Sequence, residues 1–123
     1  MSAPVVVVGD LMVDVVAAAD EPLAYGSDAA AHVRWSGGGG GANVAAWLAE
    51  LGSDVVLVSR VGDDLAGRGA VEELRAAGVD VRAAVDPARP TGTCVVVVTP
   101  DGERTMLPGR GANDALAAGD LPG

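Results

Sequence analysis

The stretch Gly37-Gly38-Gly39-Gly40-Gly41-Ala42-Asn43 decides the fold class of this chain, because a helix-forming pattern follows directly behind it. Five consecutive glycines predict a loop whose backbone approaches a ligand closely and adopts positive φ where needed. The N–H groups at the start of the following helix have no helical partners, which favours oxygen-rich ligands there. Asn43 adds an amide that both donates to and accepts from a hydroxyl. A flexible linker is the simpler interpretation, but linkers rarely lead straight into an amphipathic helix.

The apolar residues behind the glycine run recur at helical spacing, and a glycine at position 52 supplies a stop. These apolar positions are Val44, Trp47, Leu48 and Leu51. Continuous apolar segments at 5–8 and 54–59 predict strands on either side, and two such strands joined by a helix form a βαβ unit with parallel strands. Residues 9–42 are too many for a simple turn, so we expect an inserted flap of short strands.

The rest of the chain continues this alternation of helices and strands. Asp63-Asp64 begin a second predicted helix that runs to about Ala77, and alternating apolar residues at 79–85 indicate a half-buried strand. Segments 93–99 and 104–107 flank Pro100-Asp101-Gly102-Glu103, which predicts a hairpin. The pattern as a whole indicates an α/β protein.

The chain carries a formal charge of −9, and arginine is its only strong cation. An acidic chain without a basic run is not expected to bind nucleic acid or an anionic membrane. Its longest apolar runs are far too short to span a bilayer. We see no signal peptide, and the single cysteine, Cys94, suits a reducing cytoplasm. With His32 as the only histidine, no metal site is expected.

Four ordered blocks resemble the N-terminal half of the ribokinase-like (PfkB-type) carbohydrate kinases. The blocks are Gly9-Asp10 with Asp14; Gly38-Gly39 with Ala42-Asn43 and Leu51-Gly52; Val61-Gly62-Asp63-Asp64 with Gly67; and Thr91-Gly92 with Asp101-Gly102-Glu103-Arg104 and Gly111-Ala112-Asn113. The resemblance implies that residues 1–123 form part of one kinase domain. It also implies a Rossmann-like parallel sheet with a small β-sheet lid, whose strands lie within about 11–36 and 93–107.

The resemblance also implies an activity, the transfer of the γ-phosphoryl group of ATP to a sugar hydroxyl with Mg²⁺. Asp14 would accept hydrogen bonds from the sugar, and Gly38, Gly39 and Asn43 would line the same pocket. A carboxylate is a suitable acceptor on physical grounds too, since it can accept from two hydroxyls. Asp10 is equally well explained as a cap or as a site residue. For Asn43 the alternative is a helix N-cap, which need not exclude contact with the ligand.

The sequence departs from the family pattern in one large respect. The family's Asp-Thr-x-Gly-Ala-Gly-Asp motif, which supplies the catalytic base and an anion hole, is absent, and the similar Ala117-Ala118-Gly119-Asp120 is too near Asn113 to match it. We therefore expect a truncated, sugar-binding half that is inactive alone, with the catalytic Asp and the residues for ATP and Mg²⁺ lying beyond this chain. Met12 and Gly40 stand where ribokinase carries Asn and Lys, so a fructose-like sugar, a keto-sugar acid and a nucleoside all remain open as substrates.

Two other functions are compatible with parts of the sequence. Gly37-x-Gly39-x-x-Ala42 with Asp63 satisfies the loose form of a dinucleotide-binding motif of oxidoreductases, but that motif must follow its strand immediately. The second alternative function is that of a non-catalytic module, which forms a homodimer through the lid strands. It is compatible with the kinase interpretation.

Overall fold

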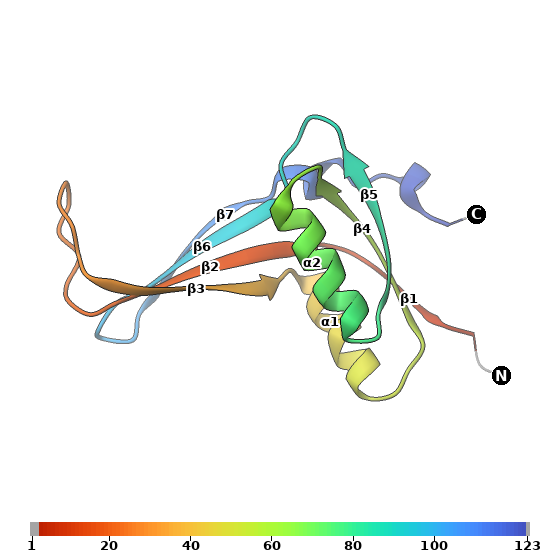
Figure 1. Ribbon diagram of the computed structural model, residues 1–123, viewed down its shortest axis with the longest axis horizontal. Helices are drawn as coiled ribbons and strands as arrows, with labels where there is room; N and C mark the ends of the chain where they lie inside the picture. Colours follow the sequence, from red (N-terminus) through yellow and green to blue (C-terminus); the bar gives the residue numbers. More distant parts are fainter. Residues whose placement is uncertain (1–2, 123) are drawn as a thin grey trace.

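Two separate sheets share this chain (Figure 1). The computed structural model describes residues 3–122. Along the chain, the described elements are β1 (Val5–Val8), β2 (Met12–Ala19), β3 (Ala31–Gly38), α1 (Gly40–Glu50), β4 (Val55–Gly62), α2 (Leu65–Ala76), β5 (Asp80–Asp86), β6 (Gly92–Val98), β7 (Arg104–Gly109) and two 3₁₀ turns, η1 (Gly111–Ala115) and η2 (Ala118–Asp120).

The first sheet is parallel, with the strand order β1-β4-β5, and it confirms the predicted βαβ unit. We call this sheet and its two helices the body. Helices α1 and α2 cover one face, where Leu57 and Val61 of β4 pack with Ala45 and Ala70. On the other face η1 contacts β4, and Val58 is fully buried. The result is a small-residue core built largely from valine and alanine.

Helix α1 differs from the prediction in where it begins. The glycine run is not a loop: Gly37 and Gly38 end β3, Gly40 and Gly41 start α1, and only Gly39 lies between the two elements. Because the helix begins at Gly40, Asn43 lies inside its first turn, and the interpretation of Asn43 as the N-cap is wrong.

The buried face of α1 also differs from the apolar stripe that predicted the helix. Its buried residues are Gly41, Ala42 and Ala45, whereas Val44 and Trp47 are 52% and 69% exposed. The physical reason is the close approach of α1 to the β1–β2 corner, where a Cβ at position 41 would lie 2.8 Å from the Gly9 carbonyl carbon. Only small residues fit against this corner, so Val44 and Trp47 face away from it, whereas Leu48 packs at the edge of the core.

Helix α2 begins at the predicted acidic pair. Asp64 is its N-cap, and its side chain accepts a hydrogen bond from the Gly67 N–H at 2.8 Å. A side-chain acceptor at this position satisfies one of the free N–H groups of the first turn. Gly78, with φ of 97°, follows the helix, as the sequence predicted.

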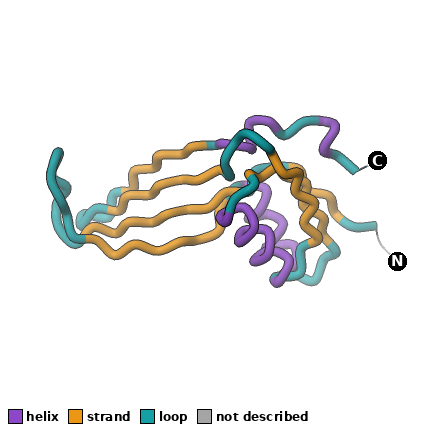
Figure 2. The backbone as a smooth tube through the Cα atoms, turned by 45° about the horizontal axis from the view of Figure 1, so that its top comes forward, coloured by secondary structure: helices purple, strands orange, loops and turns teal. Residues whose placement is uncertain are grey.

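The second sheet is mixed and has the strand order β3-β2-β6-β7. It extends away from the helices and the parallel sheet in both views (Figures 1 and 2), and we call it the lid. It consists of two antiparallel hairpins, β2–β3 and β6–β7. The inner strands of the two hairpins, β2 and β6, pair with each other in parallel. The predicted second hairpin is confirmed, with the Thr99 N–H donating to the Glu103 carbonyl at 3.0 Å. Strand β3 reaches Gly38, two residues beyond the lid segment 11–36 that the resemblance implies.

No helix within residues 3–122 is both long and apolar enough to cross a membrane.

Candidate functional site

The candidate site lies where the lid joins the body, around the start of α1. Gly39 has φ of 96° and ψ of 138°, a conformation that residues with a side chain rarely adopt. A Cβ at this position would overlap the carbonyl oxygen of Asp10. The same carbonyl accepts a hydrogen bond from the Ala42 N–H at 3.0 Å. The glycine therefore lets the corner between β1 and β2 rest directly on the helix start.

Asp14 lies beside this helix start, on β2. Its backbone is paired with Ser36 of β3, and a Cβ at Gly38 would lie 2.5 Å from its Oδ1 and 2.8 Å from its Oδ2. The structure thus brings together the carboxylate and one of the predicted glycines. Within residues 3–122, no hydrogen bond or ion pair engages the Asp14 carboxylate. It is a partly buried acceptor with its capacity free.

Asp10 is placed differently from Asp14, because its carboxylate is already engaged. The Arg110 guanidinium donates to both of its oxygens, with Nη2 3.0 Å from Oδ1, and Arg110 Nε also donates to Asp114 at 2.8 Å. The hydrogen bonds to Asp10 and then to Asp114 raise the pKa of the Arg110 guanidinium above its usual value. Asp10 therefore ties the corner between β1 and β2 to η1.

Asn113 holds the same corner through its buried amide. Its Oδ1 accepts from the Leu11 N–H and its Nδ2 donates to the Leu11 carbonyl, both at 3.1 Å. Nδ2 also donates to the Arg110 carbonyl at 3.0 Å. Gly92 makes room for this amide, because a Cβ there would overlap Nδ2. The Gly-Ala-Asn motif marks this asparagine as part of the family pattern, but nothing in the sequence indicates Leu11 as its partner.

Asn43 is exposed in the first turn of α1. It lines a hollow of about 200 Å³ together with Gly37, Gly38 and Glu73. Gly38 is thus next to both the Asp14 carboxyl and the hollow that contains Asn43.

A second polar cluster joins the lid to the start of α2. The Asp64 carboxylate accepts from the Thr91 N–H at 2.9 Å and from the Thr91 hydroxyl at 2.6 Å, and this hydroxyl accepts from the Gly62 N–H at 2.9 Å. Burial alone would raise the pKa of the Asp64 carboxyl, but the hydrogen bonds from Thr91 and Gly67 outweigh burial and hold that pKa below its usual value. The sequence predicts Asp64 at a helix start, and no sequence signal indicates its hydrogen bonds with Thr91.

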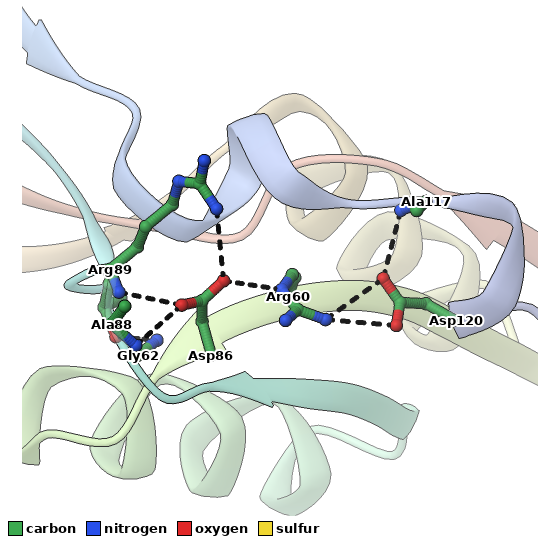
Figure 3. A network of polar contacts seen from close by, with 8 residues as sticks. Arg60, Gly62, Asp86, Ala88, Arg89, Ala117 and Asp120 are labelled. Atoms are coloured by element: carbon green, nitrogen blue, oxygen red, sulfur yellow. Dashed lines mark hydrogen bonds and ion pairs between the residues drawn. The ribbon is translucent and has the colours of Figure 1, made fainter.

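A third cluster lies at the carboxyl ends of β4 and β5 (Figure 3). Arg60 Nε donates to the buried Asp86 at 2.8 Å, and its Nη1 donates to Asp120 at 3.2 Å. The hydrogen bond from Arg60, followed by those from the N–H groups of Ala88 and Arg89, holds the pKa of the Asp86 carboxyl well below its usual range. All of these carboxylate oxygens have donors within the protein, so the cluster is structural.

No group of three or more His, Cys, Asp or Glu side chains within residues 3–122 is arranged to hold a metal ion. The dinucleotide motif also lacks its structural context. The strand that leads into the glycine run is β3, an edge strand of the lid, and it pairs with an antiparallel neighbour and not within a βαβ unit.

Comparison with known proteins gives one family. A family model described as pfkB family carbohydrate kinase matches residues 2–121. The chain is 39% identical over 101 residues to the ATP-dependent ribose-1-phosphate kinase of Halopiger xanaduensis, covering 81% of this chain and 34% of the relative. It is also 39% identical over 88 residues to the 2-dehydro-3-deoxygluconokinase of Thermoproteus tenax, covering 71% of this chain and 26% of the relative.

Among solved structures, the ribokinase of Arabidopsis thaliana complexed with ribose and ATP superimposes with a TM-score of 0.80. It is 33% identical in sequence, and the match covers 92% of this chain and 38% of that one. The chain therefore spans about a quarter to a third of the length of the curated relatives named above.

Proposed function

Because this chain belongs to the pfkB family of carbohydrate kinases, we propose that it supplies the sugar-binding half of an ATP-dependent sugar kinase. The observation that carries the proposal is the Asp14 carboxylate, which lies beside Gly38 and the start of α1. It is free of partners within residues 3–122, whereas Asp10, Asp64 and Asp86 are all engaged. A partly buried carboxylate with free acceptor capacity suits the paired hydroxyls of a sugar.

The helix start adds donors to this acceptor. The first N–H groups of α1 have no intrahelical partners, and of these the Ala42 N–H is taken by the Asp10 carbonyl. Gly41 is buried against the corner between β1 and β2, so the N–H group of the exposed Gly40 is the one assigned to sugar oxygens at the positive end of the helix. In this proposal Asp14 accepts from the sugar, the Gly40 N–H donates to it, and Asn43 contributes its amide from the first turn.

The family implies ATP and Mg²⁺, but the described residues do not form a site suited to binding either of them. No lysine occurs in the sequence, and residues 3–122 offer no cluster that would hold a divalent ion. Phosphoryl transfer depends on neutralising and positioning the phosphates. We therefore assign the catalytic base, the phosphate site and the metal to groups outside this chain, and no chemical step to its own residues. A mixture of the 123-residue chain with ATP, Mg²⁺ and a panel of sugars should yield no sugar phosphate.

Binding of sugar tests the proposal directly. Charge-assisted hydrogen bonds contribute about 1.5–3 kcal/mol each, so Asp14→Asn should weaken sugar binding by about tenfold to hundredfold in isothermal titration calorimetry. Asp54→Asn is the matched control, since Asp54 is exposed between α1 and β4. Equal binding by the Asp14 variant and the wild type would refute the proposed role of this carboxylate.

The lid supports a second part of the proposal, a homodimer. The lid face that points away from Asp14 carries an almost wholly apolar set of side chains: Val15, Ala17, Val33, Trp35, Val95 and Leu107. Trp35 is 70% exposed there, and an exposed apolar patch of this kind marks an association surface. We assign a second copy of the chain to this face. Trp35→Glu should shift the sedimenting species towards monomer, whereas Trp47→Glu, at an equally exposed tryptophan on α1, should not.

A further inference from the structure

The lid face that carries Asp14 has a second polar feature. Alternate residues of a strand point to the same face of a sheet, so Gly38, Ser36 and Arg34 of β3 share this face with Asp14. The pairing register aligns side chains in rows across the four strands. Asp14 lies in the row of Ser36, Cys94 and Pro108, and the next row towards the lid tip contains Arg34, Val16, Val96 and Met106.

Arg34 is one of two arginines without a partner in the described part of the chain. The other six arginines are engaged, five with carboxylates and Arg75 with the Val81 carbonyl. The two that remain free within residues 3–122 are Arg34 on β3 and Arg104 on β7, and the register places both on the face of Asp14. In a chain of net charge −9, two unpaired cations on one face need an explanation.

Apart from Ser36, whose hydroxyl contacts the Gly37 carbonyl at 3.4 Å, the side chains around Asp14 are apolar. Met12 and Val16 flank it along β2, and Cys94 and Val96 lie on the neighbouring strand, all four buried in one cluster. This wall offers no further acceptor or donor to a sugar. An anionic group on the ligand that lies beyond the reach of Asp14 therefore meets one cationic side chain in the adjacent row of this face, namely Arg34.

We propose that the sugar bound at Asp14 carries an anionic group, a phosphate or a carboxylate, and that Arg34 binds this group. The inference rests on the proposed sugar-binding function. From strand spacing and rise, the Cα atoms of Asp14 and Arg34 are about 8 Å apart, and an arginine side chain is long enough to span that separation. The guanidinium binds the paired oxygens of a phosphate or carboxylate in a bidentate manner. It also offsets the repulsion that Asp14 exerts on an anionic ligand.

Arg34 is assigned this role in preference to Arg104 because of distance along the sheet. Arg104 pairs with Val98 on the opposite edge of the lid, one row further from Asp14 and two strands away from β2. The two residues are the same type, lie on the same face, and occupy exposed edge strands. Arg104→Gln is therefore a matched control for Arg34→Gln.

The experiment measures binding of ribose, ribose 1-phosphate and 2-dehydro-3-deoxygluconate to the 123-residue chain by isothermal titration calorimetry. The wild type should bind at least one anionic probe about tenfold to hundredfold more tightly than ribose, and the two anionic probes separate phosphate from carboxylate. Arg34→Gln should abolish this preference and leave ribose binding unchanged. Arg34→Lys should keep part of it, and Arg104→Gln should keep all of it.

The outcomes separate this inference from the proposed function. If ribose binds as tightly as both anionic probes and Asp14→Asn weakens all three, the anionic class is wrong and the sugar site stands. If the anionic preference survives Arg34→Gln, the assignment to Arg34 is wrong. If binding of no probe depends on Asp14, both the sugar site and the anionic class are overturned.

Discussion

Alanine in place of Gly39 should destabilise the protein strongly, whereas alanine in place of the adjacent Gly40 should not. Gly39 has φ of 96°, and a Cβ there would overlap the Asp10 carbonyl and lie 3.0 Å from the Met12 N. Gly40 lies in the first turn of α1, and a Cβ there would meet no atom within 4 Å. The two glycines are neighbours in sequence, so the pair isolates the effect of the corner between β1 and β2.

The magnitudes follow from these two environments. A side chain held in a sparsely populated φ/ψ region costs about 1–3 kcal/mol, and displacing a packed backbone segment costs about 1–3 kcal/mol more. Gly39→Ala should therefore lower the free energy of unfolding by about 4 kcal/mol. Gly40→Ala should raise that free energy by up to about 1 kcal/mol, because alanine loses less backbone freedom than glycine in a helix.

Urea unfolding followed by far-ultraviolet circular dichroism measures both effects. With a slope of about 2 kcal/mol/M, the unfolding midpoint should fall by about 2 M in Gly39→Ala and rise by up to about 0.5 M in Gly40→Ala. A midpoint for Gly39→Ala within about 0.5 M of the wild type would refute the reasoning, and so would a lower midpoint in Gly40→Ala than in Gly39→Ala.

Three further predictions concern the site and its supports. Gly38→Ala would push the Asp14 carboxyl from its position, so calorimetry should show sugar binding reduced by about tenfold or more; unchanged affinity would contradict the proposed contact. Asn113→Leu leaves the Leu11 N–H and carbonyl without their partner, which should cost about 3 kcal/mol in urea unfolding; an unchanged midpoint would count against this clamp. The lowered pKa of Asp86 means that its ionised form stabilises the fold above the ordinary aspartate pKa of about 3.9, and that this contribution is lost as the pH falls below that value. Asp86→Asn should therefore flatten the loss of stability in urea midpoints measured from pH 5 downwards, and an identical acid slope in both proteins would argue against it.

The elements of the body could be predicted from the sequence because their signals are local. The valine run at 5–8 and the acidic pair before α2 each give a strand or a helix start without reference to the rest of the chain. The start of α1 could not be predicted, since five glycines resemble a loop in isolation. Contact with Asp10, which lies about thirty residues earlier, places Gly40 and Gly41 in the helix.

The supports of the site depend on pairs far apart in the chain. Asp10 and Arg110 are separated by 100 residues, and Leu11 and Asn113 by 102. No periodicity or spacing links such residues, so the engagement of Asp10 came only from the structure. The position of Asp14 was suggested by the family pattern, and its contact with Gly38 depends on the register of the β2–β3 hairpin.

The parallel pairing of β2 with β6 has a consequence for how the chain acquires its shape. Each lid hairpin closes over a short stretch of chain, but the two join only after α1, β4, α2 and β5 have come between them. Closing so long an intervening segment is slower than forming either hairpin, because its entropy is lost before the contacts form. During synthesis on the ribosome, the first hairpin would therefore emerge with the edge of β2 bare, and it would stay so until residues 92–98 arrive to cover it.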